Sequence, residues 1–331
     1  MTHLLSDDSH ALVLLCSSLA LPPQPALNAP SPLTLSQWNQ LSKKIAASPL
    51  QRPGALLNQS ADALTAMLSL PGGEAERLAG LLGRAGRLAL ELEGLFSKGM
   101  WVMTRMDETY PAHLRSTLKH LAPVLLFGAG SQSLLQRPGL AVVGSRNIDE
   151  AGAAFARQVG RRAAEAKMPV VSGGARGTDR LAMEGALDGA GITFGVLADS
   201  LERTIRQPDL RQLLLDDRLV LVTPYAPTAG FSVGAAMGRN KIIYGLSKYA
   251  VVVSSEVETG GTWAGAVEAL KGSWCPVFVR ESPQAPEGNR ALLKRGALPL
   301  SEEHLAAADN LPEWLGQQVP GKPIEQDLFS G

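Results

Sequence analysis

Two loops of this sequence combine glycine, hydroxyl and arginine residues in a way that suits an anion. The first loop contains Gly144, Ser145, Arg146 and Asn147 and directly follows an apolar run. The second loop contains Ser172, Gly173, Gly174, Arg176 and Gly177 and also follows an apolar run. Glycine lets an oxyanion approach backbone N–H groups, and arginine adds a fork of charged donors. Both loops therefore predict a binding site for phosphate.

Two further clusters have the same character. One consists of Arg239, Asn240 and Lys241, at the start of an apolar segment. The other consists of Gly260, Gly261 and Thr262, which open a predicted helix that continues to Leu270. Donors at a helix N-terminus attract anions. A solvated helix start would also explain the cationic cluster.

Two acidic residues beside the loops are expected to have structural roles. Asp149 is predicted to cap a helix from Glu150 to Lys167, and Asp179 to cap the helix that follows the second loop. A second role for Asp179, compatible with the first, is to hold Arg176 or a neighbouring loop.

The sequence offers little catalytic machinery around these loops. None of the five histidines lies between residues 121 and 303, and no acidic pair of the type found in metal sites is clustered. Cys16 and Cys275 are far apart, without a CxxC, so neither a disulfide framework nor a zinc site is expected. A polyanion held by several loops fits better than bond breaking. We therefore expect a non-enzymatic protein that uses no metal and no cofactor.

A sheet must position these loops. From Leu140 onward, short apolar runs recur at Leu140 to Val143, Pro169 to Val171, Ile192 to Leu197, Leu219 to Val222, Ala250 to Val253 and Pro276 to Val279. Helix-length segments separate most of them, a pattern typical of an α/β fold with a parallel sheet wound on both faces. Ligands of such sheets bind at the carboxyl ends of the strands. No GxGxxG follows the first of these strands, which argues against an ordinary dinucleotide-binding fold.

The first hundred residues predict a small helical domain without a chemical motif. Thr34 or Ser36 is expected to cap one helix and Ser60 or Asp62 the next. A longer helix is expected from residue 74 to about residue 95.

Composition restricts the class of protein. With 45% apolar and 19% charged residues, the chain is not disordered as a whole. The 31 basic and 31 acidic side chains cancel, yet residues 131–280 carry a net +3 and residues 281–331 a net −4. The longest apolar stretch, Ala11 to Leu21, is too short for a membrane span and follows acidic residues, so we expect a buried helix and a cytoplasmic protein.

Several stretches resemble the DNA-processing protein A (Smf) family, whose Rossmann-like domain belongs to a wider group of ligand-binding domains. The matching stretches are AVVGSRN (141–147), VVSGGARGTDRLAMEGAL (170–187), GRNKIIYGLSKYAVVV (238–253), ETGGTWAGAVEAL (258–270) and EGNRALLKRGA (287–297). They occur in the family's order and spacing, and residues 106–130 resemble the segment that precedes its Rossmann-like domain. We therefore expect a helical domain over 1–100, a Rossmann-like domain over 101–297 and an acidic, proline-containing tail over 298–331.

The resemblance implies a domain that binds single-stranded DNA in a basic pocket, forms a homodimer and helps to load the bacterial recombinase RecA. By position, the two loops and the cluster from Arg239 to Lys241 would line this pocket, with Asp179 supporting the second loop. Cations and N–H groups that follow a nucleic-acid backbone agree with this assignment. Trp263 and Tyr244 are the only aromatic residues near the loops in sequence, and both are expected in the core.

The chain also departs from the family. Many members end with a winged-helix domain, but only about 34 residues follow Ala297, so none is expected here. Thr178 stands in the second loop where an aliphatic residue is usual.

Two alternative functions remain open. One is a regulatory or antitoxin partner that binds DNA and restrains a toxin in an anti-phage module. The other is a nucleotide phosphoribohydrolase, since those relatives share the Gly260–Thr262 motif. They place a catalytic glutamate within a turn after the threonine, where this chain has Ala264 and Gly265, so this function is disfavoured.

Overall fold

One mostly parallel sheet organises the protein. The structure, a computed structural model, describes residues 5–21 and 30–320. Within these residues a nine-stranded sheet has the strand order β1-β2-β6-β5-β4-β3-β7-β8-β9. Its strands are β1 (Met100–Thr104), β2 (Leu125–Ala129), β3 (Gly139–Gly144), β4 (Val170–Ser172), β5 (Thr193–Val196), β6 (Leu219–Thr223), β7 (Ser247–Ser254), β8 (Val277–Arg280) and β9 (Leu298–Leu300). The six predicted strands and the α/β class are confirmed.

The strand order reverses between β3 and β7. From β3 the chain winds through β4, β5 and β6 in one direction, and from β7 through β8 and β9 in the other, with all of these pairs parallel. β1 and β2, which were not predicted as strands, add antiparallel pairs beyond β6. The loops after β3 and β4 therefore emerge at the same edge of the sheet, where ligands bind in such folds.

Helices cover both faces of the sheet. They are α1 (Asp7–Cys16), α2 (Leu35–Ala47), α3 (Ala61–Leu68), α4 (Gly72–Leu82), α5 (Ala85–Ser97), α6 (Ala112–Leu118), α7 (Glu150–Glu165), α8 (Thr178–Asp188), α9 (Leu201–Thr204), α10 (Pro208–Leu215), α11 (Val233–Gly245), α12 (Gly260–Gly272), α13 (Glu287–Leu293), α14 (Glu302–Ala307) and α15 (Leu311–Gln318). Side chains of α6, α11, α12 and α13 pack on one face. Those of α7, α8, α14 and α15 pack on the other, under β3, β4, β7 and β8.

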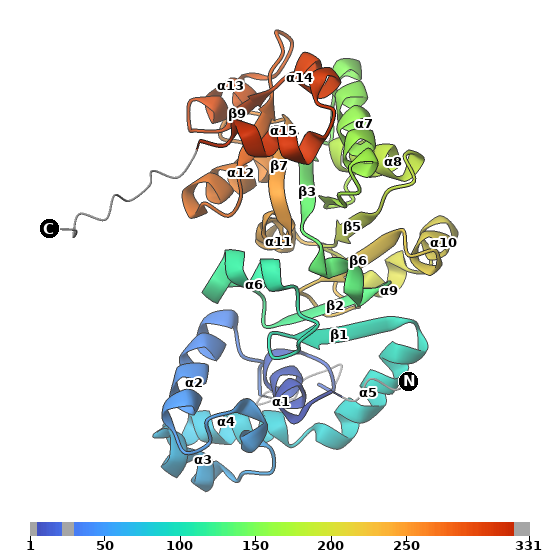
Figure 1. The fold of residues 1–331 in the computed structure, drawn as a ribbon. Helices are drawn as coiled ribbons and strands as arrows, with labels where there is room; N and C mark the ends of the chain where they lie inside the picture. The colour runs from blue at the N-terminus through green and yellow to red at the C-terminus, as the bar shows by residue number, and fades with distance from the viewer. Residues whose placement is uncertain (1–4, 22–29, 321–331) are drawn as a thin grey trace, which may run out of the picture.

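The helices of the first hundred residues pack on β1, β2 and β6. They lie at one end of the molecule, and α13 to α15 lie at the opposite end (Figure 1). Leu12, Leu78 and Leu95 share one apolar cluster with Phe127 and Leu221 of the sheet. The predicted helical region is thus joined to the sheet by a common core rather than by a solvated linker.

Local capping fixes where these helices begin. Thr34 caps α2 through a capping box, and Ser60 caps α3. Of the predicted alternatives for each helix, Thr34 and Ser60 are thus confirmed. The single long helix predicted over 74–95 is wrong, because α4 ends at Leu82 and a second helix, α5, begins at Ala85. At this break the Arg84 side chain donates to carbonyls of α1 and of the segment after it, which ties the two helices to α1.

The helices α7 and α8 approach each other closely, and this sets the position of the second loop. A Cβ on Gly160 would lie 2.1 Å from the Ala182 carbonyl oxygen, and one on Gly185 would lie 2.2 Å from the Arg157 carbonyl oxygen. Only glycine permits such backbone contact. Because α8 begins directly after the second loop, this packing holds that loop against the first.

The segment after residue 297 continues the sheet. β9 pairs in parallel with β8, and Leu305, Leu311 and Leu315 are buried beneath α7. Residues 298–319 are therefore not a separate tail, because the apolar side chains of this segment are buried against the rest of the protein. Residues 321–331 of the expected tail lie outside the described residues. In the described part of the chain, no helix combines the length and apolar character needed to cross a bilayer.

Candidate functional site

The first and second loops are tied together by hydrogen bonds. The Thr178 N–H and hydroxyl both donate to the Ser145 carbonyl oxygen, at 3.2 and 3.1 Å. Across the loops, Arg176 Nη2 donates to Asn147 Oδ1 at 3.1 Å. Thr178, which stands where the family usually has an aliphatic residue, thus connects the two loops by hydrogen bonds.

Gly177 allows this close pairing. Its φ of +86° lies in the region that favours glycine, and a Cβ there would lie 2.4 Å from the Arg146 carbonyl oxygen. A side chain at this position would push the two loops apart.

Asp149 and Asp179 act differently at the two helix starts. Asp149 caps α7 by accepting from the Gly152 N–H at 2.7 Å, as predicted. Asp179 lies within the first turn of α8 and is not its cap residue. Its buried carboxylate accepts instead from the Gly173 N–H at 3.1 Å, so Asp179 holds the second loop. The Gly173 N–H predicted to meet an anion is already used by the protein.

Burial governs the charge state of this carboxylate. Removal from water raises the pKa of Asp179 above its ordinary value, and the facing Arg239 together with hydrogen bonds from the loop opposes that rise. Burial also lowers the pKa of Arg239, opposed by Asp179. The two oppositely charged groups are both buried under the second loop.

The raised pKa of Asp179 predicts a pH effect on stability. The folded protein takes up a proton at higher pH than the unfolded chain, so it binds more protons between neutral pH and 3.8. The free energy of unfolding contributed by this group therefore rises as pH falls through that interval. Urea denaturation at several pH values should show wild type gaining stability on acidification relative to Asp179→Asn, which cannot titrate. A difference between the two proteins that does not change with pH would contradict this prediction.

The third cluster lies inside a helix. Arg239, Asn240 and Lys241 lie within α11, so the alternative explanation of the cluster as a solvated helix start is wrong. The apolar turn before Arg239 is itself helical. Arg239 is 7% exposed, and its Nη1 donates to the Val196 carbonyl oxygen at 2.5 Å. Asn240 Nδ2 donates to the Gly261 carbonyl oxygen at 3.0 Å, which links α11 to the start of α12.

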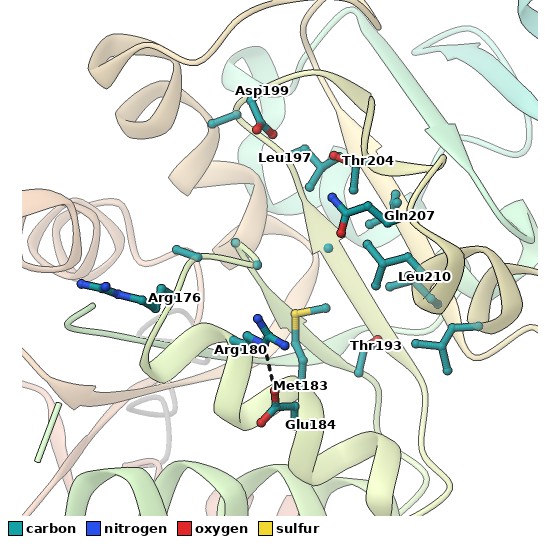
Figure 2. A pocket seen from close by; sticks show the side chains of 18 of the residues that line it. Arg176, Arg180, Met183, Glu184, Thr193, Leu197, Asp199, Thr204, Gln207 and Leu210 are labelled. Atoms are coloured by element: carbon teal, nitrogen blue, oxygen red, sulfur yellow. Dashed lines mark hydrogen bonds and ion pairs between the residues drawn. The ribbon is translucent and has the colours of Figure 1, made fainter. Parts of the chain in front are cut away.

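A cavity of about 730 Å³ opens at the ends of β4 and β5. Its cationic residues are Arg146, Arg176, Arg180 and Arg239. Further in, apolar side chains such as Met183, Leu197 and Leu210 line it, and Gly195 of β5 leaves it room. Figure 2 shows α8 on one side and the segment carrying Thr204, Gln207 and Leu210 on the other. Glu184, Asp199 and Asp209 also line the cavity, so it is cationic only in part.

The structure gathers some of the predicted site residues and separates others. Those that line the cavity are Arg146, Gly173, Gly174, Arg176 and Arg239. Those outside its lining are Gly144, Ser145, Asn147, Ser172, Gly177, Asn240, Lys241, Gly260, Gly261 and Thr262. Several of the latter hold the loops in place, as the bonds of Ser145, Asn147 and Asn240 show.

Arg180 and Phe231 are among the cavity residues that sequence reasoning missed. Arg180, one turn into α8, forms an ion pair with Glu184 at 2.9 Å. Phe231 is 54% exposed, and its ring lies 5.8 Å from the Arg146 guanidinium carbon. Tyr244 and Trp263 are buried, as predicted, but they are not the only aromatic residues near the loops. No local signal marks Phe231, because it meets Arg146 only through the fold. Among the described residues, no three His, Cys, Asp or Glu side chains are grouped to hold a metal.

The doubly wound sheet, with loops tied together at its switch point and a partly cationic cavity beside them, defines a Rossmann-like fold with a candidate ligand site. The family can be stated more closely. The sequence model of the DNA recombination-mediator protein A family matches residues 101–308, and the chain belongs to this family.

Curated relatives agree with this membership. The putative DNA processing protein DprA of Mycobacterium tuberculosis is 30% identical over 248 residues, which is 70% of this chain and 61% of the relative. The DNA processing protein DprA of Streptococcus pneumoniae is 34% identical over 159 residues, which is 47% of this chain and 54% of the relative. The chain thus spans little more than half the length of these relatives.

Solved structures share the fold. The X-ray structure of DNA processing protein A from Streptococcus pneumoniae superposes with a TM-score of 0.59 at 23% identity, covering 84% of this chain and 98% of the other. DNA processing protein A from Helicobacter pylori, described for its single-stranded DNA binding mode, gives 0.52 at 21% identity, covering 66% and 94%. At this identity the likeness establishes the fold alone.

Proposed function

We propose that this protein binds single-stranded DNA at the cationic mouth of the cavity and acts in the cytoplasm as a recombination mediator. The observation that carries the proposal is the pair Arg146 and Arg176, which line the same cavity from two loops. Among the described residues, neither has a carboxylate within ion-pair distance. Two exposed guanidinium groups without a counterion suit the phosphates of a nucleic-acid backbone.

The surrounding chemistry supports backbone recognition at the mouth. Arg239 adds a third cation beneath the second loop, where burial strengthens its field. Two of the loop N–H groups expected to bind phosphate are used within the protein, since those of Ser145 and Gly173 donate to Ser254 and Asp179. Guanidinium groups rather than backbone amides are therefore the proposed phosphate ligands.

Substitution of either exposed arginine tests the proposal. Arg146→Ala and Arg176→Ala are each expected to weaken single-stranded DNA binding about tenfold, because a charge-assisted hydrogen bond contributes roughly 1.5 kcal/mol. The slope of log affinity against log salt should fall by about 0.7 for each phosphate that the protein no longer neutralises. Fluorescence anisotropy with a labelled oligonucleotide over a series of salt concentrations measures both quantities.

A matched arginine far from the cavity serves as the control. Arg87 on α5 is about half exposed and lies 3.9 Å from Glu91, within the helical region at the other end of the sheet. Arg87→Ala should leave affinity and salt slope unchanged. Equal losses in all three variants would point to bulk charge instead of a site, and an absence of binding by wild type at low salt would reject the proposal.

The proposed partners and the non-enzymatic role need separate tests. We expect a homodimer, measurable by light scattering, and acceleration of RecA filament assembly on the bound strand. Restraint of a toxin partner is the alternative role, and co-purification with products of neighbouring genes distinguishes the two. For hydrolysis, the nearest glutamate after Thr262 is Glu268, which is exposed and does not line the cavity. Release of base from nucleoside monophosphates is therefore expected to be absent.

A further inference from the structure

An uncharged segment leads to the mouth of the cavity. Residues 224–238 contain no Asp, Glu, Lys, Arg or His. Three of their large apolar side chains are exposed: Phe231 at 54%, Val233 at 70% and Met237 at 47%. Val233 and Met237 are four residues apart on α11 and so face the same side of the helix. We call these three side chains the apolar strip.

The apolar strip reaches the cationic residues of the cavity through Phe231 alone. Phe231 lines the cavity, and the Arg146 guanidinium carbon lies 5.8 Å from the centre of its ring. This cation–π contact brings a charged donor of the first loop next to an exposed aromatic face from the segment before α11. The fold thus places Arg146, which has a group that can bind phosphate, beside Phe231, which has a ring that can stack on a base.

We propose that Phe231 stacks on a nucleobase of the strand whose phosphate is held by Arg146, with Met237 and Val233 extending the apolar surface. This inference rests on the proposed function and adds recognition of bases to recognition of phosphates. In a nucleotide the charged phosphate and the flat, apolar base face lie within one residue of each other. The pair Arg146 and Phe231 matches that arrangement, and stacking on an aromatic side chain is tolerant of sequence because every base has a π-face.

The position of the strip favours a base over a protein partner. Three side chains make a small apolar surface, whereas stable protein interfaces bury a much larger area. The surrounding segment has no charge that would repel a phosphate backbone. Exposure of a phenylalanine costs free energy of hydration, and stacking on a base removes that exposed area.

Substitution of Phe231 separates stacking from charge. Phe231→Ala is expected to weaken binding of a single-stranded oligonucleotide about tenfold while leaving the salt slope unchanged, because every cation that faces a phosphate stays in place. Phe231→Tyr should restore the affinity, since it keeps the aromatic face. Leu90→Ala, which truncates a leucine of α5 that is 70% exposed, is the control for removal of a surface apolar group and should bind as wild type. Thermal melts confirm that the variants fold.

An abasic strand of equal length and charge gives an independent readout. Wild type should bind this strand about tenfold more weakly than the base-bearing strand, and Phe231→Ala should bind the two almost equally. A fluorescent adenine analogue in the strand should be quenched on binding to wild type and not on saturation of Phe231→Ala.

The outcomes distinguish this inference from the proposed function. If Arg146→Ala weakens binding but Phe231→Ala does not, the phosphate site stands and the stacking interaction is overturned. If Phe231→Ala changes self-association in light scattering and leaves DNA binding intact, the strip is a protein interface and the inference is again overturned. If wild type does not bind single-stranded DNA, both proposals fail together.

Discussion

Asp179→Ala is expected to lower the free energy of unfolding by about 4 kcal/mol, one of the two largest effects expected in this protein. The carboxylate is 8% exposed and accepts from the Gly173 N–H at 3.1 Å. It also faces Arg239, which is 7% exposed and whose Nε has no hydrogen-bond partner among the described residues. Alanine would leave the Gly173 N–H without its acceptor and would remove the negative charge that faces the buried Arg239 guanidinium.

Urea denaturation of three variants measures the effect and its origin. Asp179→Asn keeps an acceptor for the Gly173 N–H but removes the charge that faces Arg239, so about 2 kcal/mol of the loss is expected to remain. Combining Asp179→Ala with Arg239→Met should recover part of the loss, because the unpaired cation is removed as well. Equal destabilisation by alanine and asparagine would show that charge, and not the hydrogen bond to the loop, carries the stability.

Asp149→Ala is expected to lower the free energy of unfolding by about 3 kcal/mol, through two losses. The first is the N-cap of α7, where Asp149 accepts from the Gly152 N–H at 2.7 Å. The second is the ion pair with Arg280, whose Nη1 lies 3.5 Å from Asp149 Oδ1. Arg280 is 2% exposed, and its guanidinium nitrogens have no hydrogen-bond partner among the described residues, so loss of this carboxylate leaves a buried charge uncompensated.

Asparagine at position 149 separates the two contributions. Asp149→Asn retains a good cap residue but removes the charge, so about 2 kcal/mol should remain as the cost of the ion pair. Adding Arg280→Met to Asp149→Ala should reduce the loss to that of the cap alone, about 1 kcal/mol. If Asp149→Asn is as stable as wild type, Arg280 does not depend on this carboxylate.

Local patterns were sufficient to predict much of the fold. Short apolar runs between helix-length segments predicted the six central strands, because burial on both faces demands continuous apolar residues. Thr34, Ser60 and Asp149 cap helices as predicted, since capping depends on hydrogen bonds within a few residues. The strands β1, β2 and β9 escaped prediction. Each lies toward an end of the sheet, where pairing with a distant strand, and not a local pattern, defines it.

The cluster within α11 shows why the site was only partly predictable. Arg239, Asn240 and Lys241 are adjacent in sequence and were assigned together to an anion site. A helix sends neighbouring residues in different directions, so Arg239 reaches the cavity while Asn240 bonds to the start of α12.

The sequence by itself determined that this is an α/β protein with phosphate-type loops after two strands, because residue type and periodicity act over short distances. The tertiary structure decided which of those groups are free to act. In the folded protein Asp179 accepts a hydrogen bond from the Gly173 N–H, and Arg239 is buried. Arg146 and Arg176 line the cavity, and neither has a carboxylate within ion-pair distance among the described residues. The tertiary structure also brought Phe231 to Arg146 across 85 residues of chain. Contacts of this kind depend on how α11 packs across the sheet, and a local sequence pattern does not predict that packing.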